Sequence, residues 1–357
     1  MIPALLAGWL ADRALGDPRR GHPVAGFGWL AERLEAVLWR DRRAAGAAYV
    51  GALVVGPAAA AWALQRRLGP GGRAAFLALV TWAALGSRSL GCEAAGVARA
   101  VARGDLDEAR RRLPALCGRD PSALGAAQLC RAAVESVAEN TADAVVAPLL
   151  WAAAAGPAGV VAYRCANTLD AMVGHRSPRY ERFGWAAARL DDAMTWLPAR
   201  VTALLTAACA PLAGGSARAA LRVLRRDGAD HPSPNAGRCE AAFAGALGVR
   251  LGGEVRYGER VEVRGRLGDG PLPTPSDVHR AIRLSVAVEV AALQLSHRYG
   301  GKLWITQPIP RLRCRRGARD VGGLITPSRR RGFAGTPSTP LRAQRDRFPV
   351  YTTERCT

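Results

Sequence analysis

The chain has 357 residues, of which 49% are hydrophobic, 6% aromatic and 22% charged, and this composition excludes a disordered chain, a collagen and a coiled coil. Its 50 Lys and Arg residues outnumber 29 Asp and Glu residues, so the formal net charge is +21. Because the mean hydropathy of +0.01 is high for so charged a chain, apolar residues must form blocks with arginines between them, as in membrane proteins. The arginines form no single basic helix and do not alternate with aromatic residues, so no nucleic-acid partner is expected.

Several uncharged blocks are candidates for membrane segments. Residues 47–64 are uncharged for 18 positions and are flanked by arginines, so they are long enough to span hydrocarbon. The other candidates are residues 74–86, 144–163, 201–215 and 284–295, the last weakened by Glu289. The pattern predicts an all-α polytopic integral membrane protein with three to five apolar membrane segments and sizeable polar helical or irregular connections. Alanine-rich blocks are also typical of buried helices in soluble proteins, which is the alternative.

The polar connections have structure of their own. Residues 97–113 predict a helix with arginines on one face, and Asp120-Pro121 predicts the start of a helix that runs toward Asp143. The many glycines within residues 216–274 favour turns and short irregular elements. After residue 310 the chain is rich in Arg, Pro, Ser and Thr, which predicts one membrane-embedded domain over residues 1–310 and a disordered tail over residues 311–357.

The densest cluster of acidic side chains is Glu135, Glu139 and Asp143. These residues are four apart, so on a helix they lie along one stripe, one step after Arg131. Like charges at this spacing repel by roughly 0.2 to 0.5 kcal/mol each, so a positive group should face them. A Mg²⁺ ion that carries phosphates is one candidate and an arginine from another segment is the other. The alternative is a solvated acidic face with an Arg131–Glu135 ion pair.

Further polar residues follow the apolar block at residues 144–163. They include an Asn167–Asp170 cluster, then Arg176, Arg189, Asp191 and Asp192, and then Arg200. At residues 230–237 two prolines and a glycine fix a turn that can present Ser233, Asn235 and backbone N–H groups to an anion. The chain has no P-loop and no dinucleotide-binding glycine motif, so any nucleotide must be held by Arg, Asn and carboxylate-bound Mg²⁺.

Six motifs occur in order along the chain: GDPRRGHPV at residues 16–24, GRDPSAL at 118–124, ESVAENTADAVVAPLLW at 135–151, NTLDAMVGHRSPRYERFGWAAARLDD at 167–192, PAR at 198–200 and HPSPNAG at 231–237. Together they resemble the CobD/CbiB family, the adenosylcobinamide-phosphate synthases, which are integral membrane proteins of cobalamin biosynthesis. The resemblance covers roughly residues 1 to 300. Asp143-Ala144 stands where the family pattern has Asp-Gly, and the arginine-rich tail resembles nothing in the family.

The resemblance implies an ATP-dependent ligation of adenosylcobyric acid to (R)-1-amino-2-propanol or its O-phosphate, with Mg²⁺ as cofactor. A carboxylate is a poor electrophile, so it must first be phosphorylated, which requires metal and arginine groups to neutralise charge. The implied catalytic residues are Glu139, Asp143, Asp170 and Asp191, and the implied metal ligands are Glu135, Glu139 and Asp143. The implied substrate- and ATP-binding residues are Asn140, Asn167, Arg176, Arg189, Arg200, Ser233 and Asn235, with Arg164 as a further anion clamp.

The expected partners are the corrinoid substrate, aminopropanol or its phosphate, membrane lipid and other late enzymes of the pathway. The expected location is the cell membrane, with several spans and the site facing the cytoplasm. The alternative function is a non-enzymatic transporter or scaffold for corrinoid intermediates.

The block at residues 144–163 sets a geometric condition on any shared site. As one straight helix it would separate Asp143 from Arg164 by about 30 Å. One site could not then use both Glu139 and Asp170. The sequence contains Pro148 and Gly156-Pro157, so we expect the segment to bend and return to the same face, covered by other helices.

Overall fold

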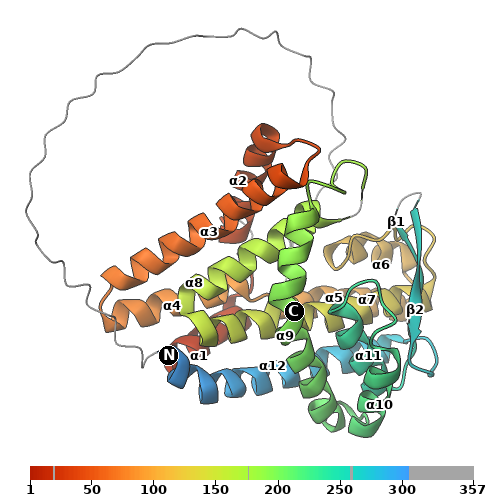
Figure 1. The fold of residues 1–357 in the computed structure, drawn as a ribbon. Helices are drawn as coiled ribbons and strands as arrows, with labels where there is room; N and C mark the ends of the chain where they lie inside the picture. The colour runs from red at the N-terminus through yellow and green to blue at the C-terminus, as the bar shows by residue number, and fades with distance from the viewer. Residues whose placement is uncertain (19–20, 176, 258–259, 305–357) are drawn as a thin grey trace, which may run out of the picture. The chain divides into compact units, whose positions relative to one another are not determined.

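The computed structural model of the chain describes residues 1–18, 21–175, 177–257 and 260–304. The predicted tail at residues 311–357 and the candidate Arg176 lie outside these residues. The described part is helical apart from one β-hairpin (Figure 1). The helices are α1 (Ile2–Leu15), α2 (Pro23–Leu38), α3 (Arg43–Arg67), α4 (Pro70–Ala84), α5 (Ser87–Ala102), α6 (Leu106–Arg112), α7 (Ala126–Thr141), α8 (Ala147–Leu169), α9 (Trp185–Cys209), α10 (Ala217–Asp227), α11 (Ala236–Leu247) and α12 (Pro275–Trp304).

Six shorter elements complete the described fold. Two short 3₁₀ turns are η1 (Leu113–Ala115) and η4 (Ala210–Ala213), and two π-helical turns are η2 (Ala142–Val146) and η3 (Asp170–Gly174). Strands β1 (Leu251–Tyr257) and β2 (Arg260–Leu267) pair antiparallel as one hairpin.

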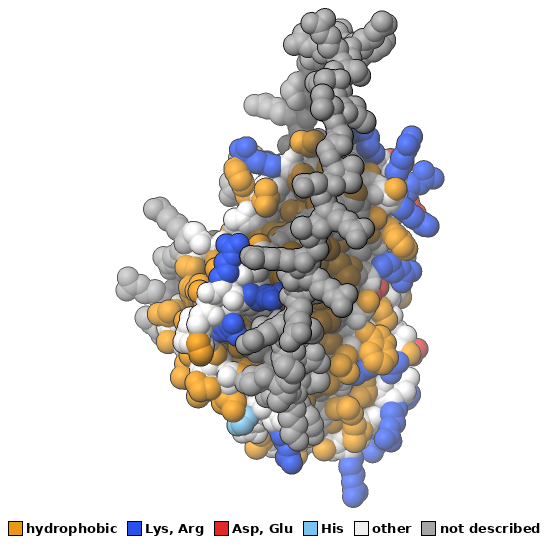
Figure 2. Space-filling model, turned by 60° about the vertical axis from the view of Figure 1, so that its left-hand side comes forward, with side chains coloured by type: hydrophobic (Ala, Val, Ile, Leu, Met, Phe, Trp, Pro, Cys, Tyr) orange, Lys and Arg blue, Asp and Glu red, His pale blue; other side chains and the backbone are white. Residues whose placement is uncertain are grey.

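Four helical stretches in the described residues are long and apolar enough to cross a membrane. They are Arg43–Arg67, Pro70–Ala102, Ala126–Gly174 and Trp185–Ala213. The protein is thus an all-α polytopic membrane protein, as the sequence predicts. The four stretches contain the predicted blocks at residues 47–64, 74–86 and 144–163 and most of the block at residues 201–215. Residues 284–295 lie within α12, which is not among these stretches. In Figure 2 hydrophobic side chains cover much of the displayed face, as expected for a surface that meets lipid.

Helix starts follow local chemistry. Pro23, Pro70 and Pro275 each stand in the first turn of a helix, where a missing N–H costs nothing. The Ser216 side chain accepts a hydrogen bond from the Ala219 N–H and caps α10. The same rules explain why α12 begins at Pro275: the Asp277 carboxylate accepts hydrogen bonds from the Thr274 N–H and hydroxyl.

The two largest apolar cores hold most of the described helices together. The larger is formed mainly by α5, α7, α11 and α12 around side chains such as Leu129 and Phe243. The smaller lies among α2, α3, α8 and α9, where the Tyr49 and Phe183 rings are 5.0 Å apart. Gly46 allows α3 to touch the backbone at Phe183, because a Cβ at this position would overlap the Phe183 carbonyl.

Three predictions about the polar connections are wrong. Residues 97–113 are not one helix, because Gly104 at φ 77° separates α5 from α6 and Asp105 caps the second helix. Asp120 does not begin α7, since its carboxylate instead accepts a bond from the Ser122 N–H within a turn.

The third wrong prediction concerns residues 216–274, which form regular structure rather than mainly turns. They contain α10, α11 and the β-hairpin. Their glycines allow close backbone contacts: a Cβ at Gly265 would overlap the Asp230 carbonyl, and one at Gly252 would overlap the Gly265 carbonyl.

Candidate functional site

A sharp bend in α8 determines which residues can share a site. Gly156 has φ 62° and ψ −152°, a conformation that side-chain-bearing residues rarely adopt, and the helix changes direction there. The segment before Gly156 continues from α7, and the segment after it returns (Figure 1). The predicted bend is confirmed at Gly156-Pro157, whereas Pro148 lies in the first turn of α8 and does not break it.

The two arms of the bent α8 segment are nearly equal in length. Asp143 precedes Gly156 by 13 residues and Asp170 follows it by 14, so each arm is about 20 Å long. The carboxylates of Asp143 and Asp170 therefore come within electrostatic range of each other. In a straight helix they would lie about 40 Å apart.

Both of these aspartates stand on π-helical turns. Asp143 belongs to η2 and Asp170 to η3. Gly174 ends η3, and a Cβ there would overlap the Asp170 carboxylate, so glycine is required for this packing. Such turns interrupt α-helices and are frequent at functional sites, because they redirect side chains that an α-helix would place elsewhere.

Four acidic side chains lie within electrostatic range of one another at these turns, and we call them the carboxylate cluster: Glu139, Asp143, Asp170 and Asp191. Each interacts electrostatically with at least two of the others, although they come from α7, η2, η3 and α9. Asp191 is buried, while the other three are partly exposed and accessible to a ligand. The structure thus brings together all four residues that the sequence analysis proposed as catalytic.

Arginine and amide groups surround the carboxylate cluster. The Arg164 Nη1 donates to the Asn167 Oδ1 at 3.2 Å, and the Asn167 Nδ2 donates to the Asp191 Oδ1 at 3.3 Å. Arg164 also interacts electrostatically with Asp143, and its Nε has no hydrogen-bond partner among the described residues. An anion that bound beside the cluster would find a guanidinium with unused hydrogen-bonding capacity.

The turn at residues 231–237 approaches the same region. The Asn235 Nδ2 donates to the Asp192 carbonyl at 2.9 Å, and the Arg200 Nη1 donates to the Asn235 Oδ1 at 3.3 Å. Ser233 has a local role, since its hydroxyl accepts from the backbone N–H groups of Asn235 and Ala236 at the start of α11. The turn therefore places Asn235 against α9, between Asp192 and Arg200 of that helix.

Two further candidates lie at the edges of this region. Arg189 is exposed, with a guanidinium 3.9 Å from the Asp192 carboxylate. The Asn140 amide donates to the Ser136 carbonyl at 2.9 Å, one turn earlier in α7. The same nitrogen lies 3.2 Å from the Ser136 hydroxyl, so it is engaged within α7.

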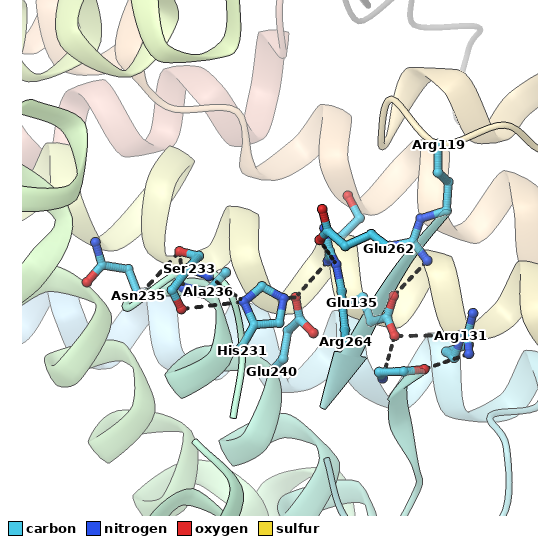
Figure 3. Close-up of polar contacts among 12 residues, drawn as sticks. Arg119, Arg131, Glu135, His231, Ser233, Asn235, Ala236, Glu240, Glu262 and Arg264 are labelled. Atoms are coloured by element: carbon cyan, nitrogen blue, oxygen red, sulfur yellow. Dashed lines mark hydrogen bonds and ion pairs between the residues drawn. The ribbon is translucent and has the colours of Figure 1, made fainter. Parts of the chain in front are cut away.

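Glu135 is engaged in holding the β-hairpin. Its carboxylate lies 2.7 Å from the Arg119 Nη1 and 3.7 Å from the Arg131 Nε, and it accepts a 2.8 Å bond from the Gly252 N–H (Figure 3). Arg131 in turn donates to the carbonyls of Gly252 and Glu254. An arginine from another segment, Arg119, therefore faces Glu135, together with Arg131 of the same helix.

A second group of charged residues was missed by the sequence analysis. Glu240 on α11 is fully buried, 3.8 Å from the Arg264 Nη1 and 3.7 Å from the His231 Nε2 (Figure 3). Burial raises the pKa of Glu240, and the nearby Glu135 and Glu139 raise it further. Arg264 and Arg119 also interact electrostatically with Glu139, so this group adjoins the carboxylate cluster.

His231 is held as a neutral ring in one orientation. Its Nδ1 accepts a 3.0 Å bond from the Ser233 N–H, so the remaining proton is on Nε2, which faces Glu240. Burial, and then the positive charge of Arg264, lowers the pKa of His231 to about 4. This histidine is thus fixed beside the Glu240 carboxyl group, at a distance longer than a hydrogen bond.

The same arrangement occurs at the other His-Pro pair. His22 Nδ1 accepts a bond from the Val24 N–H, and its Nε2 lies 3.5 Å from the Asp17 carboxylate. Asp17 interacts electrostatically with Arg164, which connects the N-terminal motif to the carboxylate cluster. In both places the residue after the His-Pro dipeptide donates its backbone N–H to the imidazole. The repeated dipeptide is therefore a sequence signal for a histidine held in one orientation beside an acid.

An apolar cavity adjoins the cluster. Its volume is about 200 Å³, and it lies among α2, α3, α4 and α8. Phe27, Pro57 and Val80 are among its lining residues, whereas Arg164 and Thr168 supply its polar groups. A small molecule with one apolar part and one anionic part would match these surroundings.

The carboxylates of the candidate site suit a magnesium ion that is also bound by substrate phosphates. Within the described ranges, no three Asp, Glu, His or Cys side chains converge into a ready metal site. Magnesium is commonly held by only one or two carboxylates, with substrate phosphates and water as the other ligands. The partly exposed Glu139 and Asp143 fit that mode, whereas Glu135 is already bound to arginines.

Comparison with known proteins decides the family. Residues 5–285 match the family model described as CobD/Cbib protein. The chain belongs to the CobD/CbiB family. It is 54% identical over 292 residues to the cobalamin biosynthesis protein CobD of Mycobacterium tuberculosis, which covers 82% of this chain and 93% of that protein. No solved structure matches the chain.

Other relatives of this CobD/CbiB protein carry the same description. The cobalamin biosynthesis protein CobD of Geobacter metallireducens is 43% identical over 300 residues, covering 82% of this chain and 94% of that protein. That of Rhodobacter capsulatus is 43% identical over 284 residues, covering 76% and 89%. The matched family region contains the whole carboxylate cluster and the β-hairpin that supports it.

Proposed function

We propose that this protein acts in cobalamin biosynthesis as an ATP-dependent amide ligase. It joins the carboxylate of adenosylcobyric acid to (R)-1-amino-2-propanol or its O-phosphate. The observation that carries the proposal is the convergence of Glu139, Asp143, Asp170 and Asp191 beside Arg164. The names of the relatives, cobalamin biosynthesis proteins, support the pathway.

The chemistry of amide formation matches these residues. Phosphoryl transfer from ATP to the substrate carboxylate releases ADP and forms an acyl phosphate, which the amine attacks with loss of phosphate. Magnesium, when bound, would shield the charge of the triphosphate. Glu139 and Asp143 would hold it, and Arg164 and Arg200 would bind the phosphate oxygens.

The other two acids suit proton transfer. The amine arrives as an ammonium ion and must lose a proton before it can attack. Asp170 is partly exposed within the carboxylate cluster, so it is the group that we assign to accept that proton. Asp191 is buried and accepts a hydrogen bond from Asn167, which fits a role in orienting the Asn167 side-chain amide.

We also propose that the protein resides in the cell membrane with the site facing the cytoplasm, where ATP is available. The second candidate function is a transporter of corrinoid intermediates. A bent helix beside acidic residues is also how transporters build ion sites, and α8 has that form. The polar groups around the carboxylate cluster favour the ligase, because they provide binding for phosphate as well as for cations.

The test is product formation by the purified protein in detergent with ATP, Mg²⁺, adenosylcobyric acid and each form of the amine. The expected result is ADP and amide in equal amounts, lost in Glu139→Gln and Asp143→Asn. The matched control is Asp107→Asn, an exposed acid on α6, which should retain activity. Transport of corrinoid into vesicles without ADP formation would overturn the ligase proposal and support the transporter.

A further inference from the structure

Helix α10 presents two chemically different faces. Ala220 and Val223 are buried on the side that packs against α11. Gly245 of α11 allows very close packing, because a Cβ there would lie 2.6 Å from the Ala219 carbonyl oxygen and 2.8 Å from the Ala220 Cα. The orientation of α10 is therefore fixed by its apolar face, and its opposite face must remain outward.

The outward face is an arginine stripe formed by Arg218, Arg222 and Arg225. Spacings of four and three residues place these side chains on one side of a helix. All three are exposed, and no acidic partner for them occurs in the part of the chain that the structure describes. The next residue, Arg226, differs because it is paired with Asp227 and Asp269.

The arginine stripe borders a hollow on the surface. The hollow has a volume of about 570 Å³ and is lined by the stripe together with Leu221 and Arg226. Three neighbouring cations repel one another, and only counterions from solution relieve this repulsion in the absence of a bound anion. The hollow is large enough to hold a phosphate group with its substituents.

The position of α10 in the chain indicates the source of that anion. Trp185–Ala213 is one of the four stretches able to cross a membrane, and α10 begins four residues after it ends. Leu212, in the last turn of this stretch, is 75% exposed. An exposed leucine followed by a row of arginines is the order expected where a helix leaves the hydrocarbon and enters the headgroup layer.

We propose that the arginine stripe of α10 binds the anionic headgroups of phospholipids in the leaflet where α9 ends. Because arginines gather on the cytoplasmic side of membrane proteins, that leaflet is the cytoplasmic one. The turn at residues 231–237 is not part of this lipid contact, because it meets α9 at Asp192 and Arg200, well before the helix ends. The argument for the lipid site does not depend on the proposed ligase reaction.

Lipid retention measured by native mass spectrometry tests the proposal. The protein is purified in mild detergent containing equal amounts of phosphatidylglycerol and phosphatidylcholine. The wild type should retain phosphatidylglycerol preferentially. In the triple variant Arg218→Gln/Arg222→Gln/Arg225→Gln the ratio of retained phosphatidylglycerol to phosphatidylcholine should be at least tenfold lower. The matched control, Arg99→Gln/Arg103→Gln/Arg111→Gln, removes the same charge from exposed positions on α5, α6 and their connection and should behave as the wild type.

Two results would overturn the proposal. One is equal loss of preference in both triple variants, which would mean that net charge alone attracts the lipid. The other is binding of inorganic phosphate by the wild type with no preference for phosphatidylglycerol, which would identify a free-anion site. Unfolding temperatures of all three proteins, which should agree, show that the stripe variant is folded.

A second measurement tests the side of the membrane. Ala229 is exposed just after α10, and an Ala229→Cys variant can be treated with a membrane-impermeant maleimide. Labelling above the wild-type background should occur in inverted vesicles and not in right-side-out vesicles. The reverse pattern would contradict a cytoplasmic position for the stripe.

Discussion

Glu135→Gln separates a structural role of this side chain from a role in metal binding. In the wild type the Glu135 carboxylate lies between the guanidinium groups of Arg119 and Arg131 and accepts the Gly252 N–H. The exposed fractions of the three charged side chains are only 1%, 6% and 9%, so water cannot replace the lost charge. Removal of one partner of a buried ion pair costs about 3 to 5 kcal/mol.

The expected result is therefore a loss of stability with an unchanged magnesium requirement. A glutamine can still accept the Gly252 N–H, so we expect the lower limit, about 3 kcal/mol, which lowers the unfolding temperature by roughly 5 to 10 °C. Hydrogen exchange at the Gly252 amide should become faster, because this bond anchors β1. The control Glu108→Gln breaks partly exposed ion pairs on α6, where water can reach the charges, and should change stability much less.

A different outcome would refute this reasoning. If Glu135→Gln unfolds at the wild-type temperature while amide formation requires several-fold more Mg²⁺, then Glu135 is a metal ligand and its contacts with arginine are secondary. Both quantities can be measured on the same detergent preparation.

Two further changes test the buried acid of α1 and the bend of α8. Burial, and then the charge of Glu289, raises the pKa of Asp12 to about 7, so the folded protein binds this proton more tightly than the unfolded chain. The stabilisation from this proton is therefore complete at low pH and is lost as the pH rises from about 4 to about 7. Between pH 5 and 8 the free energy of unfolding of the wild type should fall by roughly 2 to 3 kcal/mol relative to that of Asp12→Asn. If the free energies of unfolding of the two proteins depend on pH in the same way, this assignment is wrong. Gly156→Ala should lower stability by about 1 to 3 kcal/mol in a thermal unfolding assay, because alanine does not tolerate φ 62°, whereas Gly51→Ala, which meets no neighbour within 4 Å, should not.

Much of the membrane part could be predicted from the sequence because hydropathy depends only on composition along the chain. The uncharged block at residues 47–64 corresponds to α3, and the glycine-proline pair at residues 156–157 marks the bend of α8. From that bend it followed that Glu139 and Asp170 could share a site. Equal arm lengths on either side of Gly156, a property of the sequence itself, make the convergence possible.

The supporting charges could not be predicted in the same way. Arg119, Glu240 and Arg264 come from a loop, a helix and a strand, and only the tertiary structure brings them near Glu139. The β-hairpin left a signal that was missed, namely the alternation of apolar and charged residues at positions 260–264. The glycines around it were taken to indicate turns, whereas Gly252 and Gly265 allow backbones to touch.

The bend at Gly156 also makes the carboxylate cluster depend on helices that contribute none of its acids. The backbone groups freed at the bend must be covered by protein when they are at membrane depth. Helices α3 and α4 both pack against α8. A substitution on either helix that loosens this packing would therefore disturb the carboxylate cluster without changing any of its four side chains.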